Sequence, residues 1–246
     1  MKTKRRFNIW LWVLLCVPCL LASCDHDVHD GEEEGGLSVS LTWADEADQG
    51  TEVKDVKLWI FNADKGSLIE EKHYGSTEEV ASQRFELPEG TYRILTTTNL
   101  TEPFFISEQT RALTNWNNIL IGLTNPKDVR NNAYFGVTDV KIDNKEGNYV
   151  VQNPIRSVLA ELTIIIENIP KGTEMSGKAL DCAWCLFPTL KNSDGEYGLP
   201  SIEPTEVELP TLLATESTLK SEVIRLMPTI QGSPASHVYL RLLLPN

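Results

Sequence analysis

Histidine, methionine and cysteine are scarce in this 246-residue chain, which has four, three and five of them. Two of the four histidines lie together in one short acidic run near the N-terminus. The motifs G-x-S-x-G, H-E-x-x-H, the P-loop and G-x-G-x-x-G are missing. We therefore predict no enzymatic activity, no metal site and no dissociable cofactor. A pair of carboxylates that meets only in space, as in a glycosidase, stays open.

Basic residues are also few, because 22 Lys and Arg stand against 35 Asp and Glu. Residues 1–23 contain four cations and no anion, so removing them takes the formal net charge from −13 to −17. A surface with that charge is soluble and repels phosphate backbones. Nucleic acid is therefore excluded as a partner.

The chain has no apolar run long enough to cross a bilayer as a helix. Its most apolar stretch, Ile9–Ala22, is about 14 residues long, whereas a spanning helix needs roughly 20. A basic head of Lys2, Lys4, Arg5 and Arg6 precedes it. A basic head followed by a short apolar run is typical of a secretory signal, so we predict a signal peptide over residues 1–23.

The end of this segment, Leu21-Ala22-Ser23-Cys24, resembles the lipobox of bacterial lipoproteins. The resemblance implies cleavage before Cys24, which would carry a thioether-linked diacylglycerol and an N-acyl chain. Two or more acyl chains give stable anchoring, whereas one chain is marginal. Cys16 and Cys19 lie inside the apolar run without this context.

Residues 24–36 continue as an acidic run that ends in two glycines. It holds one apolar side chain after Cys24, so we predict a flexible tether, about 20 Å long on average. Metal chelation by His26 and His29 with the neighbouring acids is the alternative. A cysteine followed by acids also resembles the surface-export signal of Bacteroidales-type lipoproteins. That resemblance implies a lipid-anchored, outer-membrane location with exposure at the cell surface.

From Leu37 onward the pattern is typical of short strands. Residues 37–43 alternate apolar and polar, and residues 53–74 predict a hairpin about the turn Asn62–Gly66. Apolar residues at both parities in Leu58–Phe61 predict a strand covered on both faces. A turn at Leu87–Gly90 precedes a threonine-rich strand. Residues 107–123 are less strand-like, and we expect one helix there.

The second half of the chain begins with a β-branched run. We predict one long central strand over 155–169, bounded by two prolines. Further strands are expected at 180–187, 222–227 and 237–244. Regular strand spacing predicts an all-β protein with two β-sandwich domains, 37–152 and 153–246.

The last predicted strand lies in "HVYLRLLLPN", and no return strand follows it in the sequence. Two alternatives remain. Either this strand closes its sheet, or the second sandwich is incomplete and leaves an edge that needs a partner.

Cys182 and Cys185 form a C-x-x-C with Ala183 and Trp184 between them. A thioredoxin-like site would need a βαβ context, and zinc would need a second ligand pair. Side chains three positions apart in a strand point to opposite faces, so a disulfide between them needs a turn. Free structural thiols and a local disulfide both remain open. The runs Asp143–Gly147 and Asn192–Gly195 are predicted turns, with calcium loops as the alternative.

Several segments together resemble one family. These are the lipobox with its acidic run, "VKLWIFNADKGSLI", "FELPEGTYRILTTTN", "NNAYFGVTDVKI" and "IRSVLAELTIIIENI". In this order, over about residues 10–170, they resemble the FimB-like fimbrial anchor lipoproteins, the minor subunits of Bacteroidales-type fimbriae.

The resemblance implies two tandem transthyretin-like Greek-key sandwiches. It also implies that the protein anchors a fimbria in the outer membrane and helps assemble it. Its partners would be fimbrial structural subunits, held without covalent bonds by a strand that adds to an exposed sheet edge. After about residue 171 the resemblance fades. The alternative is a glycan-binding or scaffold lipoprotein, which exposed coplanar rings of Trp43, Trp59, Trp116 and Trp184 would favour.

Overall fold

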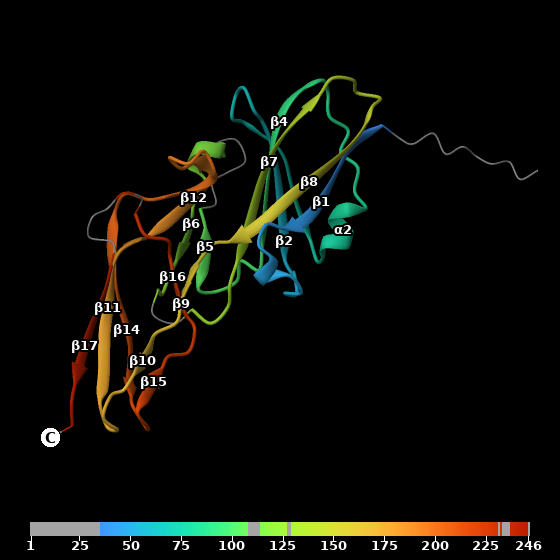
Figure 1. Ribbon diagram of the computed structural model, residues 1–246. Helices are drawn as coiled ribbons and strands as arrows, with labels where there is room; N and C mark the ends of the chain where they lie inside the picture. The colour runs from blue at the N-terminus through green and yellow to red at the C-terminus, as the bar shows by residue number, and fades with distance from the viewer. Residues whose placement is uncertain (1–34, 108–113, 127–128, 231, 233–236, 246) are drawn as a thin grey trace, which may run out of the picture. The chain divides into compact units, whose positions relative to one another are not determined.

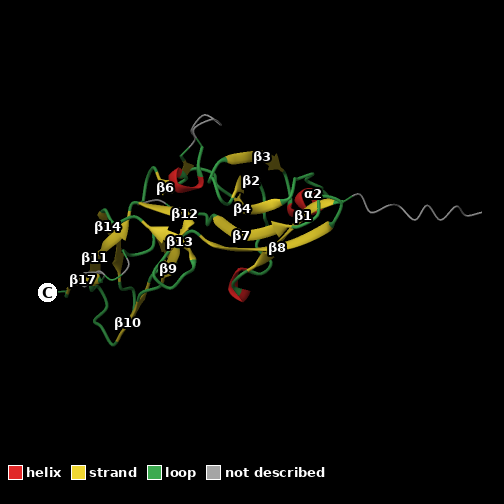
Figure 2. Ribbon diagram, turned by 90° about the horizontal axis from the view of Figure 1, so that it is seen from above, coloured by secondary structure: helices red, strands yellow, loops and turns green. Residues whose placement is uncertain are grey.

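The computed structural model describes residues 35–107, 114–126, 129–230, 232 and 237–245. The predicted signal peptide, Cys24 and the tether through Glu34 lie outside them. Strands dominate the described residues, with one short helix, α2 (Thr77–Ala81), and two 3-10 turns, η1 (Glu46–Asp48) and η2 (Trp116–Asn118) (Figure 2). The predicted all-β class is confirmed. Within these residues no helix is both long and apolar enough to span a membrane.

The first half forms one six-stranded sheet in the order β1-β8-β7-β4-β2-β3 (Figure 1). Its strands are β1 (Gly36–Trp43), β2 (Val56–Asn62), β3 (Leu68–Tyr74), β4 (Gly90–Thr98), β7 (Tyr134–Ile142) and β8 (Asn148–Ser157). β1 runs parallel to β8, and the other neighbouring strands are antiparallel.

Local chemistry explains the two turns predicted in this half. In the β2–β3 hairpin the Asn62 side chain accepts hydrogen bonds from the backbone N–H groups of Asp64 and Lys65. Gly66 follows at φ 69°, a left-handed conformation that glycine adopts without steric cost. At the start of β4 the Tyr92 hydroxyl donates to the Pro88 carbonyl over 2.6 Å. The hairpin turn is confirmed, and at Leu87–Gly90 the chain bends at Glu89 before β4 begins.

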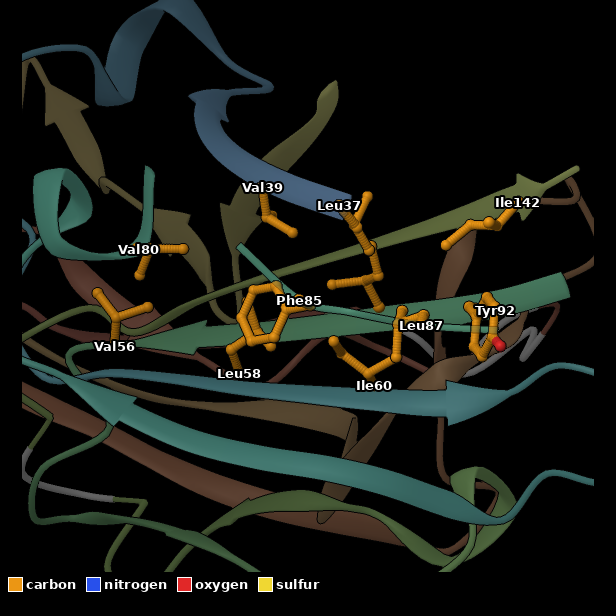
Figure 3. Close-up of a cluster of buried hydrophobic side chains, with 11 residues drawn as sticks. Leu37, Val39, Val56, Leu58, Ile60, Val80, Phe85, Leu87, Tyr92 and Ile142 are labelled. Atoms are coloured by element: carbon orange, nitrogen blue, oxygen red, sulfur yellow. The ribbon is translucent and has the colours of Figure 1, made fainter. Parts of the chain in front are cut away.

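Two apolar clusters lie on opposite faces of β2 and β4. Leu58 and Ile60 point into the cluster shown in Figure 3, together with Leu37 and Val39 of β1. Their neighbours on β2, Trp59 and Phe61, belong to the other cluster. The prediction that residues 58–61 are covered on both faces is confirmed.

The helix expected over 107–123 is wrong for the part that the structure describes. Residues 114–123 contain η2 and the short strand β6 (Ile121–Leu123), and residues 108–113 lie outside the description. The Asn115 side chain accepts from the Asn117 N–H, and Asn118 accepts from the Asn115 N–H. Asparagine side chains that bond to nearby backbone favour a capped turn over a helix interior.

The long central strand expected over 155–169 is also wrong. β8 ends at Ser157, and two short strands follow, β9 (Ala160–Leu162) and β10 (Ile165–Glu167). The Ser157 hydroxyl both accepts from the Leu159 N–H and donates to the Leu159 carbonyl, which closes a turn. β9 and β10 then lie in separate two-stranded sheets. A β-branched run favours extended backbone, but it does not keep the strand in one sheet.

The remaining strands complete the other sheets. They are β5 (Phe104–Ile106), β11 (Glu174–Ala183), β12 (Cys185–Lys191), β13 (Tyr197–Pro200), β14 (Pro204–Leu213), β15 (Thr218–Lys220), β16 (Ile224–Leu226) and β17 (Val238–Leu243). The sheets run β13-β12-β6-β5, β14-β11-β17, and the ribbons β10-β15 and β16-β9. The strands predicted at 222–227 and 237–244 are confirmed as β16 and β17. The residues of the strand predicted at 180–187 are extended except at Trp184, where the prediction of one continuous strand is corrected to the end of β11 and the start of β12.

The core of the second half lies between the three-stranded sheet and the two ribbons. Most of its buried members come from β11 and β14 on one side and from β15 and β16 on the other, and Ile164 and Ala214 lie in connecting segments. β8 continues through the predicted boundary at 152/153, so the division into two domains stays a prediction.

Candidate functional site

β17 is an edge strand of the sheet β14-β11-β17 (Figure 1). Its only strand partner in the described chain is β11, in an antiparallel register that sets Val238 opposite Ala179, Leu240 opposite Gly177 and Leu242 opposite Met175. All six residues of β17 are exposed. Among the described residues, no strand pairs with the outer backbone edge of β17.

The face of β17 that turns toward the core is apolar and uncovered. Residues paired across a sheet share a face, and the β11 partners Met175 and Ala179 are buried at 0% and 3% exposure. On the same face Val238, Leu240 and Leu242 are 39%, 43% and 41% exposed. None of them belongs to a buried cluster of the described residues. The opposite layer of the sandwich covers β11 and stops short of β17.

Gly177 brings β17 close to its neighbour. A Cβ atom at Gly177 would lie 2.4 Å from the Tyr239 carbonyl oxygen and 3.0 Å from a methyl of Leu240. It would also lie 3.2 Å from a methyl of Leu209 on β14. The missing side chain lets leucines from both flanking strands approach the same point over β11.

Two other edge strands carry features that discourage pairing. β3 presents charged and polar side chains at Glu70, Glu71, Lys72 and His73, and β14 contains Glu206, Glu208 and Pro210. Charges and proline at an edge are the usual protection against unwanted strand addition. β17 has one charged residue, Arg241, among apolar and aromatic ones. Of these three edges, β17 is the one least protected by charge and proline.

Cys182 and Cys185 are placed as buried, free thiols. They stand on either side of the break at Trp184, Cys182 on β11 and Cys185 on β12. Burial raises the pKa of the Cys185 thiol to about 11 and also raises the pKa of Cys182. Thiols held in this protonated state are poor nucleophiles.

The four tryptophans named for a glycan platform do not form one. Trp59 is buried at 5% exposure, and Trp43 meets Tyr134 edge-on at 80°. The ring of Trp116 is covered by the guanidinium of Arg93 at 3.6 Å. Trp184 is 36% exposed. These four rings therefore lack the coplanar, exposed arrangement that would favour sugar stacking.

The two predicted turns are confirmed as turns. In the first, Asn144 accepts hydrogen bonds from the N–H groups of Glu146 and Gly147. In the second, Asn192 accepts from those of Asp194 and Gly195. Among the described residues no group of three or more His, Cys, Asp and Glu side chains is placed to hold a metal ion.

A groove of about 850 Å³ is lined by β14, by the segment 220–225, and by Pro126, Val129 and Arg130. Its apolar lining includes Val207, Leu209 and Ile224, and charged side chains of both signs also line it. Because neither sign of charge dominates, the lining of the groove does not indicate which class of ligand would bind there.

The profile of the family described as fimbrillin-A associated anchor proteins Mfa1 and Mfa2 matches residues 24–221. The chain belongs to this family. The resemblance to fimbrial anchor proteins predicted from the sequence is confirmed, and the match extends beyond residue 171. Membership in the Mfa2 family makes the chain a fimbria-associated protein of the cell surface that interacts with other fimbrial subunits.

Solved structures share the fold. The fimbrial anchor protein Mfa2 from Porphyromonas gingivalis matches with a TM-score of 0.58 and 15% identity, over 85% of this chain and 77% of that one. A Bacteroides thetaiotaomicron protein described as an adhesin matches with 0.58 and 11%, over 85% and 75%. A Bacteroides ovatus adhesin matches with 0.56 and 16%, over 85% and 71%. No curated protein matches.

Sequence reasoning found the strand but missed which of its features matter. The run "HVYLRLLLPN" is apolar at both parities, which is typical of a strand covered on both faces. In the structure neither face of β17 is covered. Arg241 is the one charged residue in this run, and a single charge does not distinguish an edge strand from a covered one.

Proposed function

We propose that this chain is an outer-membrane lipoprotein that anchors a fimbria and holds a fimbrial subunit by strand addition at β17. The protein binds and positions its partner and performs no chemistry. Three features support the proposal: family membership, the lipobox at Cys24 with its acidic tether, and the open edge of β17.

The observation that carries the proposal is the uncovered core face of β17. Val238, Leu240 and Leu242 form an apolar row that continues the buried core past its last covered strand. An added strand would bond to the free backbone edge, and its inward side chains would extend the apolar layer over this row. Main-chain hydrogen bonds then supply affinity and the alternate side chains supply specificity.

The proposed membrane anchor is the lipid on Cys24, which the acidic run connects to the folded part. A diacylglycerol and an N-acyl chain on Cys24 anchor the protein stably, because each buried CH₂ contributes about 0.8 kcal/mol. The acidic run from Asp25 to Glu34 separates that anchor from the first strand. In this arrangement the folded part stands at the cell surface and its last strand is available to the fimbria.

Two paired variants test the strand at the level of the cell. Leu240→Lys with Leu242→Lys places charges on the core face, whereas Tyr239→Lys with Leu243→Lys places them on the outer face. We expect detached fimbriae, seen by electron microscopy, for the first pair and attached ones for the second. A full deletion should reproduce the detachment. Fimbriae that stay attached and of normal length in the deletion strain would refute the anchor function.

A further inference from the structure

We infer that the segment that adds to β17 carries an acidic side chain directly opposite Arg241, between two apolar residues. This inference rests on the proposed strand addition and specifies the chemistry of the partner. It identifies an apolar, acid-containing extended peptide as the occupant of the edge.

Arg241 stands alone on its strand. Within the part of the chain that the structure describes, its guanidinium makes no hydrogen bond or ion pair. Each of the other described arginines has a recorded interaction: Arg93, Arg156 and Arg225 form ion pairs with carboxylates, Arg84 donates to a backbone carbonyl, and Arg130 is also engaged. An unpaired cation on an otherwise apolar edge is unusual, because edge charges elsewhere in this molecule stand among other charged groups.

The neighbours of Arg241 on the outer face do not neutralise it. Its cross-strand partner on β11 is Ser176, which is uncharged. Lys178, one pair further along, already binds Glu206 at 3.1 Å and Glu208 at 3.3 Å. Glu174 lies on the other diagonal, opposite Leu243. Diagonal neighbours are about 7–8 Å apart. Glu174 therefore does not occupy the position next to Arg241 on the unpaired side of β17, where a residue of an added strand would lie.

Sheet geometry fixes what can fill that position. A residue of an added strand directly opposite Arg241 has its Cβ about 4.5–5.5 Å away on the same face. The residues before and after it point to the core face, where they meet Leu240 and Leu242. The added strand therefore reads apolar-acid-apolar at this point, in either strand direction.

The charge also sets the register. A slip of one residue would turn the acidic side chain onto the apolar core face and leave Arg241 opposite an apolar residue. Burying an unpaired carboxylate is costly. Apolar contacts along β17 supply attraction in several registers, and the pair with Arg241 selects one of them.

Two peptides test the inference on the purified full-length chain in detergent. One is Thr-Val-Thr-Val-Glu-Val-Thr, and the other has lysine in place of glutamate. Dye-labelled peptides are titrated by fluorescence polarisation. We expect the glutamate peptide to bind about fivefold more tightly, as an exposed cross-strand ion pair allows. Arg241→Glu should reverse the preference. Lys145→Glu, the same charge change in the distant turn after β7, should leave it unchanged.

The outcomes separate this inference from the anchor function. Equal binding of both peptides to the unmodified chain, or binding by neither at millimolar concentration, overturns the inference. An equal preference in the Arg241→Glu and Lys145→Glu variants also overturns it, since the effect would then come from net charge. The anchor function is judged independently, by whether core-face lysines on β17 detach fimbriae from cells.

Discussion

Arg93 links parts of the fold that are far apart in sequence. Its guanidinium bonds to Asp139 of β7, with Nε to oxygen at 2.7 Å, and lies over the ring of Trp116. Tyr197 of β13 donates its hydroxyl to the same carboxylate at 2.6 Å. Burial alone would raise the pKa of Asp139, but the hydrogen bonds from Arg93 and Tyr197 hold it below its ordinary value. One side chain thus joins the six-stranded sheet to the sheet that contains β13.

Removing Arg93 should weaken the fold. We expect Arg93→Ala to lower the free energy of unfolding by about 2 kcal/mol, because Asp139 loses its ion pair and Trp116 its cation. Arg93→Lys should restore less than half of this, since an ammonium cannot form the two-pronged contact. Urea unfolding measures both, with Arg84→Ala as an exposed control. An unchanged midpoint for Arg93→Ala would contradict the proposed role.

The cluster around Arg93 illustrates what residue patterns cannot reveal. Arg93, Asp139 and Tyr197 belong to three separate segments, and each is unremarkable in its own strand. Only the sheet register brings Arg93 and Asp139 opposite each other. The chemistry predicted for Cys24, by contrast, is readable from four consecutive residues, because a peptidase recognises such a site in an extended chain.

At the scale of the element, the contact between β11 and β17 depends on Gly177. Gly177→Val should loosen β17, because the new side chain would displace the Tyr239 carbonyl and the two leucines beside it. Overpacking of this kind costs about 1–3 kcal/mol, so amides of residues 238–243 should exchange hydrogen about tenfold faster or more.

Ser176→Val provides the matched control for Gly177→Val. Ser176 pairs with Arg241 on the outer face of β11, and it already carries a Cβ atom, so valine there is the smaller change. Hydrogen exchange followed by mass spectrometry compares the two variants. The same protection of residues 238–243 in both would show that Gly177 does not control the docking of β17.

Strand prediction succeeded where signals were local and failed where they were not. The β2–β3 hairpin is specified by alternation and by Asn62 and Gly66, all within the hairpin itself. Residues 155–169 have equally strong β propensity, yet Ser157 breaks the run and its pieces pair with β15 and β16. β14 was not predicted, because a segment with two prolines and two glutamates does not resemble a strand. It forms a strand because it pairs with β11.

At the scale of the whole molecule, we predict that the lipid anchor determines where the protein is located and has no effect on how it folds. Cys24→Ala should release the protein from the membrane fraction, because the thiol that carries the diacylglycerol is gone. The circular dichroism spectrum should stay unchanged, since the described fold begins at Gly35. Fractionation with immunoblotting measures the release, and Cys19→Ala is the matched control. Continued membrane association of the Cys24→Ala protein would refute lipidation.

The family and the all-β class are readable from the amino-acid sequence alone, whereas the open edge is not. Class and family follow from strand spacing and from an ordered set of short motifs that extends over half the chain. The state of β17 depends on how far the opposite layer reaches, and that distance is not encoded in the residues of β17. Its sequence allows a covered strand and an edge strand equally.

The parallel pairing of β1 with β8 has a mechanical consequence. Their register contains eight residue pairs, from Gly36 opposite Asn148 to Trp43 opposite Ile155. The chain enters at the first residue of β1, and β8 continues from its far end toward β9 and the second half. A pull on the chain ahead of Gly36, resisted by the second half, therefore acts along both strands in opposite directions. It loads the whole ladder in shear, so the pairs must yield together instead of opening one by one. Survival under tension is a matter of unfolding rate, and this geometry slows it.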